Sequence, residues 1–141
     1  MDRTSSARWE GDLKSGKGML RIGDGSFTGA YSAGSRFANE AGNNPEELIA
    51  AAHASCFSMA FAAGLSKAGF APKRIETSAT VHLNKLGEGY AITGIDLVSK
   101  AEVPGAAPEL VAKTGEDAKK NCPVSKALAA VPITLKVSGG P

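Results

Sequence analysis

The sequence contains few of the residues that build metal sites and has little net charge. It holds two cysteines, Cys56 and Cys122, and two histidines, His53 and His82, with no CxxC pair. A tetrahedral zinc site needs four such ligands at regular spacing, so we expect neither a metal nor a bound cofactor. The net charge is only +2, without a basic block, which argues against nucleic acid or a membrane as the main partner.

The amino terminus also has no long apolar run. It lacks the basic start, apolar stretch and small-residue cleavage site of a secretory signal, so we expect a cytoplasmic protein. One apolar stretch, residues 48–65, is long enough for a membrane span, but it is mostly alanine and carries His53, Ser55 and Ser58. We interpret it as a buried helix of a single domain that covers residues 1–141.

The order of elements along the chain predicts an α+β fold with antiparallel sheet. Strands are expected at 3–10, 17–22 and 26–31, at 75–86 and 90–103, and at 132–138, with a frayed tail at 138–141. Residues 29–44 read as a loop. Helices are expected from Asn44 to about Lys67, over 107–121, and directly after Cys122, because asparagine and proline favour helix starts.

Both cysteines can be inert buried thiols or a working redox pair, because a permanent disulfide is disfavoured in a reducing cytoplasm. Cys122 precedes a proline that favours a helix start, and a thiol at a helix N-terminus is stabilised as thiolate. Cys56 lies about three turns inside its helix and would need a cation from another segment. Arg36 is the candidate, although it is equally a solvated loop residue.

Four segments together resemble the OsmC/Ohr family of organic hydroperoxide reductases. They are "NPEELIAAAHASCFSMAF", "NCPVSKAL", "WEGDLKSGKG" and "SRF", and the likeness covers nearly the whole chain. The resemblance implies a cysteine-based peroxidase that acts in oxidative and osmotic stress defence on organic or lipid-like hydroperoxides. It also implies antiparallel sheets packed around a long buried central helix, an intertwined homodimer, and reduction by a lipoylated protein or a small dithiol.

The resemblance also assigns roles to four residues of this chain. It makes Cys56 the peroxidatic cysteine, Cys122 the resolving cysteine, and Arg36 the activating cation. Glu46 is the carboxylate that holds the arginine, with Glu47 as its neighbouring rival, although Glu47 also suits a capping interaction with Asn44.

Helix geometry adds an expectation about two chains. Ten helical residues span about 15 Å, so Glu46 and Cys56 of one straight helix cannot meet. If two copies cross antiparallel near Ala51, Glu46 of one chain approaches Cys56 of the other. Alanines at 50–52 and 54 would allow a close crossing, or would simply pack tightly in a core.

Other residues and functions stay open from the sequence. His53 shares a helix face with Cys56 and can be a base, although we expect it and His82 to be structural. Phe57, Met59 and Phe61 can favour an alkyl tail but more simply form core. A lipophilic small-molecule binding protein and a general thiol-disulfide exchanger remain alternative functions.

Overall fold

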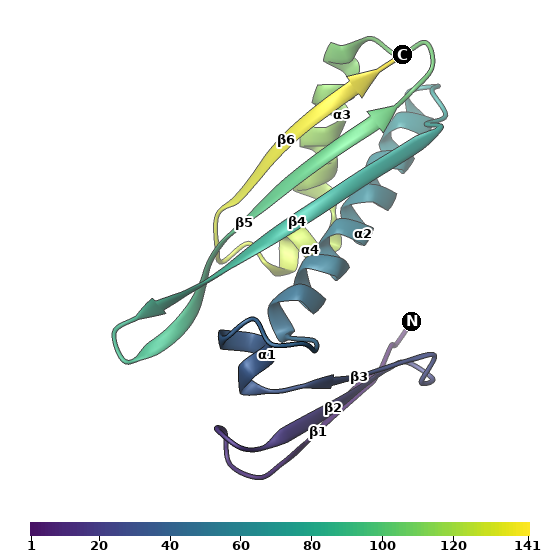
Figure 1. Cartoon of the computed structure of the whole chain (residues 1–141). Helices are drawn as coiled ribbons and strands as arrows, with labels where there is room; N and C mark the ends of the chain where they lie inside the picture. Colours follow the sequence, from purple (N-terminus) through teal and green to yellow (C-terminus); the bar gives the residue numbers. More distant parts are fainter. The chain divides into compact units, whose positions relative to one another are not determined.

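The computed structural model describes residues 1–141, which form six strands and four helices in the order β1-β2-β3-α1-α2-β4-β5-α3-α4-β6 (Figure 1). Contacts within the chain divide it into two compact units, Met1–Leu48 and Ile49–Pro141. Each unit is described by itself below. The α+β class is confirmed, and the single domain stays a prediction.

The first unit contains a three-stranded antiparallel sheet. Its strands are β1 (Ser5–Glu10), β2 (Lys17–Ile22) and β3 (Phe27–Tyr31), in the order β1-β2-β3, close to the predicted ranges. Among the large hydrophobic side chains of this unit, only Leu20 is buried. Small domains are marginal even with a full core, so this sheet needs a further surface to cover its apolar residues.

The loop predicted for residues 29–44 is wrong in its first part. Residues 29–31 belong to β3, and Ala33–Phe37 forms a short helix, α1, that carries Arg36 in its last turn. Ser32 starts the helix by accepting a hydrogen bond from the Ser35 backbone N–H, and the Ser35 hydroxyl accepts one from the Ser32 N–H. This reciprocal capping box stabilises a helix too short to show apolar periodicity in its sequence.

The long helix α2 (Pro45–Lys67) has the predicted bounds. The Asn44 side chain accepts the Glu47 backbone N–H at 2.9 Å, which satisfies one of the unpaired donors of the first turn. The helix ends at Lys67 and is followed by Gly69, whose φ of 91° is left-handed, and Phe70 donates its N–H back to the Leu65 carbonyl. This is the hydrogen bond of a Schellman motif.

The second unit contains a mixed sheet rather than the purely antiparallel one predicted. Strands β4 (Arg74–Leu86) and β5 (Gly89–Glu102) form the expected hairpin, but β6 (Ile133–Gly140) pairs with β5 in parallel. The connection through two helices returns the chain to the same end of the sheet, which makes a parallel pair possible. The predicted frayed tail is also wrong, because residues 138–140 pair with residues 100–102.

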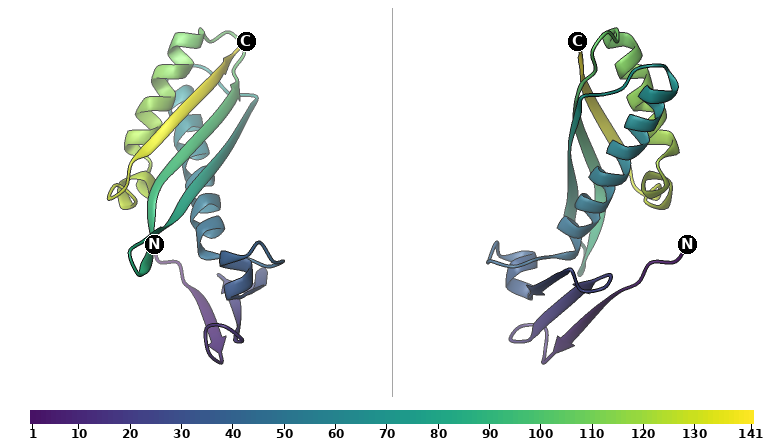
Figure 2. Two further views of the ribbon diagram at one scale, coloured as in Figure 1. Left: turned by 60° about the vertical axis from the view of Figure 1, so that its left-hand side comes forward. Right: turned by 90° about the vertical axis from the view of Figure 1, so that its right-hand side faces the viewer.

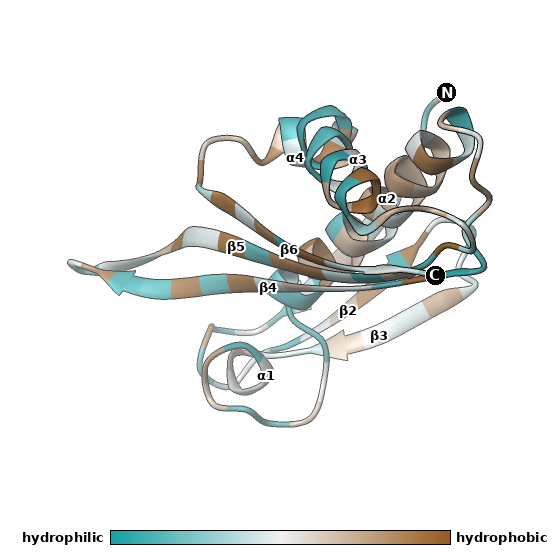
Figure 3. Ribbon diagram, turned by 90° about the horizontal axis from the view of Figure 1, so that it is seen from above, coloured by the Kyte–Doolittle hydropathy of each residue, from teal (hydrophilic) through white to brown (hydrophobic).

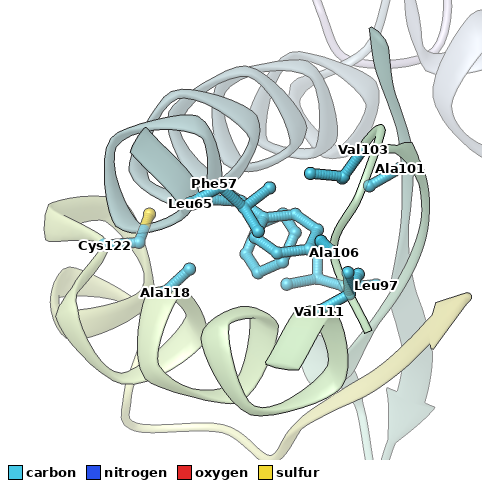
Figure 4. Close-up of a cluster of buried hydrophobic side chains, with 10 residues drawn as sticks. Phe57, Leu65, Leu97, Ala101, Val103, Ala106, Val111, Ala118 and Cys122 are labelled. Carbon is cyan, nitrogen blue, oxygen red and sulfur yellow. The ribbon is translucent and has the colours of Figure 1, made fainter. Parts of the chain in front are cut away.

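Helices α2 and α3 (Pro108–Asn121) lie side by side on one face of this sheet, and the short helix α4 (Pro123–Ala127) follows α3 (Figures 1 and 2). Their side chains form one buried cluster with those of β5 and of the loop that follows it (Figure 4). The cluster consists of Phe57, Phe61, Leu65, Leu97, Ala101, Val103, Ala106, Val111, Ala118 and Cys122. Phe57 and Phe61 are therefore core residues, as expected, whereas the same expectation is wrong for Met59, which is exposed.

The burial expected for α2 holds for only one side of the helix within this chain. The helix is apolar over most of its length (Figure 3), yet only 22% of its most apolar stretch is buried. By length and composition alone it could cross a membrane. Its exposed residues recur on one face, at Ala51, Ala52, Ser55, Met59 and Ala63. Nothing within the single chain covers this face.

Candidate active site

The two cysteines meet in the second unit. The sulfurs of Cys56, on α2, and Cys122, between α3 and α4, lie 3.0 Å apart, and both thiols are free. Cys122 closes α3 by donating its N–H to the Ala118 carbonyl, and its own carbonyl accepts the Lys126 N–H at the start of α4. Pro123 fixes the backbone between these bonds, so the turn holds the Cys122 sulfur against α2.

Access to the two sulfurs differs. Cys122 has no exposed surface and belongs to the buried cluster (Figure 4), whereas Cys56 is only partly buried. A small oxidant can therefore reach Cys56, while Cys122 can react only with a partner that is already beside it. The pair has the asymmetry that a peroxidatic and a resolving cysteine require.

The surroundings of the two thiols shift their pKa values in opposite directions. Burial raises the pKa of Cys56, and the hydrogen bond with Cys122 raises it further. Burial also acts to raise the pKa of Cys122. This effect is outweighed by hydrogen bonding to Cys56, to the backbone and hydroxyl of Ser125, and to the backbone of Val124, so the pKa of Cys122 is lowered. These directions favour ionisation of Cys122 over ionisation of Cys56, in the sense that the helix-start argument predicted.

Arg36 and Glu46 meet in the first unit. The Arg36 Nη2 donates to Glu46 Oε1 at 2.7 Å, and its Nε lies 3.2 Å from both carboxylate oxygens. Glu46 is buried although it carries a charge, which the guanidinium compensates. The backbone N–H of the neighbouring Glu47 instead donates to the Asn44 side chain that caps α2. The structure thus pairs Arg36 with Glu46 rather than with Glu47.

An apolar pocket lies beside Arg36 and was not predicted from the sequence. Its volume is about 250 Å³, and its lining consists of Trp9, Leu13, Tyr31, Ser32, Ala33, Arg36, Phe37 and Pro45. The guanidinium carbon lies 5.2 Å from the centre of the Phe37 ring, within the range of a cation–π contact. The pocket therefore places one cation next to a mostly apolar wall.

The four predicted site residues form two pairs rather than one cluster. Arg36 and Glu46 are bonded in the first unit, and Cys56 and Cys122 are in contact in the second. Glu46 and Cys56 stand ten residues apart on one helix, about 15 Å along its axis. No cationic side chain is among the causes that shift the pKa of Cys56.

The histidines occupy different environments. His53 is fully buried, and its Nε2 lies 2.7 Å from the hydroxyl of Ser125. His82 is exposed and pairs with Asp96 at 2.7 Å. Sequence reasoning missed Ser125, although its place three residues after Cys122 at a helix start is a signal for a hydroxyl that points back to the preceding turn.

Comparison with known proteins identifies the family of this chain. The sequence model of the family described as OsmC-like protein matches residues 38–136. The chain is 46% identical over 134 residues to "Peroxiredoxin OsmC" from Escherichia coli strain K12, covering 94% of this chain and 93% of that protein. A protein of the same name from Shigella flexneri matches to the same extent.

Solved structures show the same fold. The organic hydroperoxide resistance protein OhrB of Bacillus subtilis is 26% identical and superposes with a TM-score of 0.76, covering 96% of this chain and 98% of that chain. An organic hydroperoxide resistance protein OsmC from Legionella pneumophila is 23% identical with a TM-score of 0.77, covering 96% of both chains. The chain therefore belongs to the OsmC-like protein family.

Proposed function

We propose that this chain is a thiol peroxidase that reduces organic hydroperoxides to alcohols in defence against oxidative and osmotic stress. The observation that carries the proposal is the 3.0 Å contact between an accessible Cys56 and a buried Cys122. The name of the Escherichia coli relative supports the reaction class, and that of the Bacillus subtilis protein supports the substrate class.

The proposed reaction has two chemical steps within the protein. The Cys56 thiolate attacks the terminal peroxide oxygen, the O–O bond breaks, and the alkoxide leaves with a proton as the alcohol. Cys56 is then a sulfenic acid. The Cys122 thiolate attacks its sulfur, which forms the disulfide and releases hydroxide that takes up a proton as water. Resolution by a sulfur already in contact protects Cys56 from irreversible oxidation to the sulfinic acid.

The roles proposed for Arg36 and Glu46 follow from their ion pair. Cys56 needs a cation to lower its pKa, because burial and the contact with Cys122 raise it. A guanidinium can stabilise a thiolate and donate to the peroxide oxygens, and Glu46 fixes its orientation. The apolar pocket beside Arg36 is suited to the alkyl or aryl part of the substrate.

We place Arg36 of one chain beside Cys56 of a second copy, in a homodimer. The exposed small-residue face of α2 supports a close crossing of two such helices near Ala51. Exposed apolar side chains of the first unit, among them Met19, Ile22 and Phe27, support the same conclusion, because a second copy would cover them.

An external dithiol completes the proposed cycle. A dihydrolipoamide-type compound or a lipoylated protein reduces the disulfide by thiol-disulfide exchange, without a cofactor bound to this chain. Two free thiols in contact suit a reducing compartment, which supports a cytoplasmic location.

The test is peroxide consumption by the parent, Cys56→Ser and Cys122→Ser with cumene hydroperoxide and dihydrolipoamide. We expect Cys56→Ser to lose turnover, and Cys122→Ser to be oxidised once and then to accumulate sulfinic acid. Undiminished turnover in Cys56→Ser would refute the peroxidase. A lipophilic binding protein would keep ligand binding in Cys56→Ser. An exchanger would reduce model disulfides better than peroxides.

A further inference from the structure

The His53 side chain is buried beside the cysteine pair, and the proposed reaction does not use it. It lies on α2 three residues before Cys56 and has no exposed surface. Its Nε2 is 2.7 Å from the hydroxyl oxygen of Ser125, a residue of α4 that is itself buried. The other ring nitrogen, Nδ1, is buried without a hydrogen-bond partner.

Ser125 links this imidazole to the resolving cysteine. Ser125 stands three residues after Cys122 at the start of α4, and its backbone N–H and hydroxyl are among the groups that lower the pKa of Cys122. A serine hydroxyl has one hydrogen to donate, so when it donates to the Cys122 thiolate its oxygen can only accept from His53. This requires the neutral imidazole with its hydrogen on Nε2.

The unpartnered Nδ1 agrees with that tautomer. With the hydrogen on Nε2, Nδ1 keeps only a lone pair without a partner. The opposite tautomer would bury the Nδ1–H group without an acceptor, which is rarer in proteins than an unpaired acceptor. It would also place two acceptors, His53 Nε2 and the Ser125 oxygen, face to face, unless the hydroxyl turned away from Cys122. In this tautomer His53 donates to the Ser125 oxygen, which leaves the Ser125 hydrogen free to point toward Cys122.

We propose that His53 is a positioning residue for the resolving step: it holds the Ser125 hydroxyl toward Cys122 and so stabilises the thiolate that attacks the Cys56 sulfenic acid. This inference rests on the proposed peroxidase function. The new S–S bond forms as the S–O bond breaks, and the proton lost when Cys122 ionises balances the one taken up by the departing hydroxide. His53 and Ser125 keep their own hydrogens throughout.

A role for His53 as the base is less compatible with its surroundings. A base would have to become imidazolium in a buried place, and burial lowers the pKa of His53. No carboxylate is bonded to its free nitrogen. A neutral donor is therefore the form in which the imidazole is stable.

Several titratable groups stand on the elements around Cys122. Those nearest to Cys122 along these elements include Cys56 and His53 on α2, Lys119 and Lys120 in the last turn of α3, and Lys126 in the last turn of α4. Lys119 is paired with Glu116. Of these groups, only Cys56 is among the main causes of the shift in the pKa of Cys122. Strands β5 and β6 contribute apolar side chains to the surroundings of Cys122. A change in the pH dependence of resolution can therefore be traced to the Ser125 bond.

The test compares His53→Leu and Ser125→Ala, which remove the donors, with His53→Gln and Ser125→Thr, which retain one. His82→Leu, at an exposed position of β4, is the control for loss of a histidine. Stopped-flow mixing with one equivalent of cumene hydroperoxide, followed by quenching and mass spectrometry, gives separate rates for Cys56 oxidation and for disulfide formation. Thermal unfolding checks that each variant is folded.

We expect the ratio of disulfide formation to Cys56 oxidation to fall about tenfold in His53→Leu and Ser125→Ala, the effect of one hydrogen bond to a charged group. The pH dependence of disulfide formation should move upward by about one unit, since one pKa unit corresponds to the same factor. His53→Gln and Ser125→Thr should recover most of the rate. Equal behaviour of His53→Leu and His53→Gln, or an unmoved pH profile, would overturn the proposal.

A second experiment separates this inference from the peroxidase itself. Diamide oxidises thiols without peroxide chemistry, and the second thiol displaces its adduct to form the same disulfide. The upward shift of the pH profile in His53→Leu should appear with diamide as well. If peroxide fails to oxidise the parent but the shift is present with diamide, the peroxidase proposal is refuted and the role of His53 is retained. If the shift is absent with diamide, the role of His53 is refuted.

Discussion

The difference in hydrogen bonding between the two thiols explains why the site needs residues from elsewhere. Cys122 has donors from the turn that carries it, so its thiolate is stabilised locally. Cys56 sits in mid-helix, where the backbone N–H groups already donate to carbonyls, and burial raises its pKa. A mid-helix cysteine can become reactive only through groups from another segment.

The neighbouring carboxylates Glu46 and Glu47 allow a matched test of the arginine's orientation. Glu46→Gln removes the charge that holds Arg36 but keeps the shape of the side chain, so kcat/KM for cumene hydroperoxide should fall about tenfold to a hundredfold. Glu47→Gln leaves its backbone bond to Asn44 intact and should stay within about twofold, as most surface changes do. Equal losses in both variants would contradict the assignment of Glu46.

At the scale of elements, Asp96 on β5 connects all three strands of its sheet. It accepts hydrogen bonds from Thr134 on β6 at 2.5 Å and from His82 on β4 at 2.7 Å. The Thr134 bond, and then the His82 bond, hold the pKa of Asp96 below its ordinary value. The folded state therefore binds this proton less tightly than the unfolded state does.

This lowered pKa predicts a pH-dependent contribution to stability. It is present above the unfolded pKa near 3.8 and is lost as the pH falls through the folded value. Asp96→Asn should reduce the free energy of unfolding at neutral pH, and the difference from the parent should shrink in acid. Urea unfolding at both pH values measures it, and Thr134→Val should reproduce part of the effect. A difference that does not change with pH would exclude the linkage.

The packing of α3 on the sheet depends on Gly115. A Cβ atom at this position would lie 2.7 Å from a methyl group of Val137 on β6. Gly115→Val should therefore lower the free energy of unfolding by about 1–3 kcal/mol, the usual cost of overpacking. Gly89→Val in β5, where no atom lies within 4 Å of the new Cβ, is the control and should not destabilise. Urea unfolding of both variants tests this, and equal stabilities would show that α3 can shift away.

Local signals in the sequence predicted most elements, and the misses have two causes. The start of α2 was predictable because Asn44, Pro45 and Gly69 act within a few residues. The parallel pairing of β6 and the contact of Ser125 with His53 depend on partners 38 and 72 residues away. A short helix such as α1 has no room for a periodic pattern. Long-range contacts of this kind leave no local signature.

At the scale of the whole molecule, the uncovered face of α2 predicts assembly. Ala51 is exposed in the single chain, so Ala51→Glu should not disturb the fold but should separate two crossing helices. We expect a lower mass by sedimentation and a parallel loss of Cys56 oxidation by peroxide. Ala112→Glu, at an exposed position of α3, is the control and should change neither. A dissociated variant that still reacts at the parent's rate would separate reactivity from assembly.

A mixing experiment tests whether two chains share one site. Cys56→Ser keeps Arg36, and Arg36→Ala keeps both cysteines, so each variant alone should be nearly inactive. In a dimer of the two, a shared site would combine Arg36 of one chain with Cys56 and Cys122 of the other, and the second site would lack both groups. Random pairing of equal amounts should then restore about one quarter of the parent's turnover.

If Arg36 acted on the cysteine of its own chain, no mixed dimer would contain a complete site, and the activity would stay at the sum of the two variants. Refolding the variants together and separately, with dihydrolipoamide as reductant, distinguishes these outcomes because only chain exchange differs between the two samples.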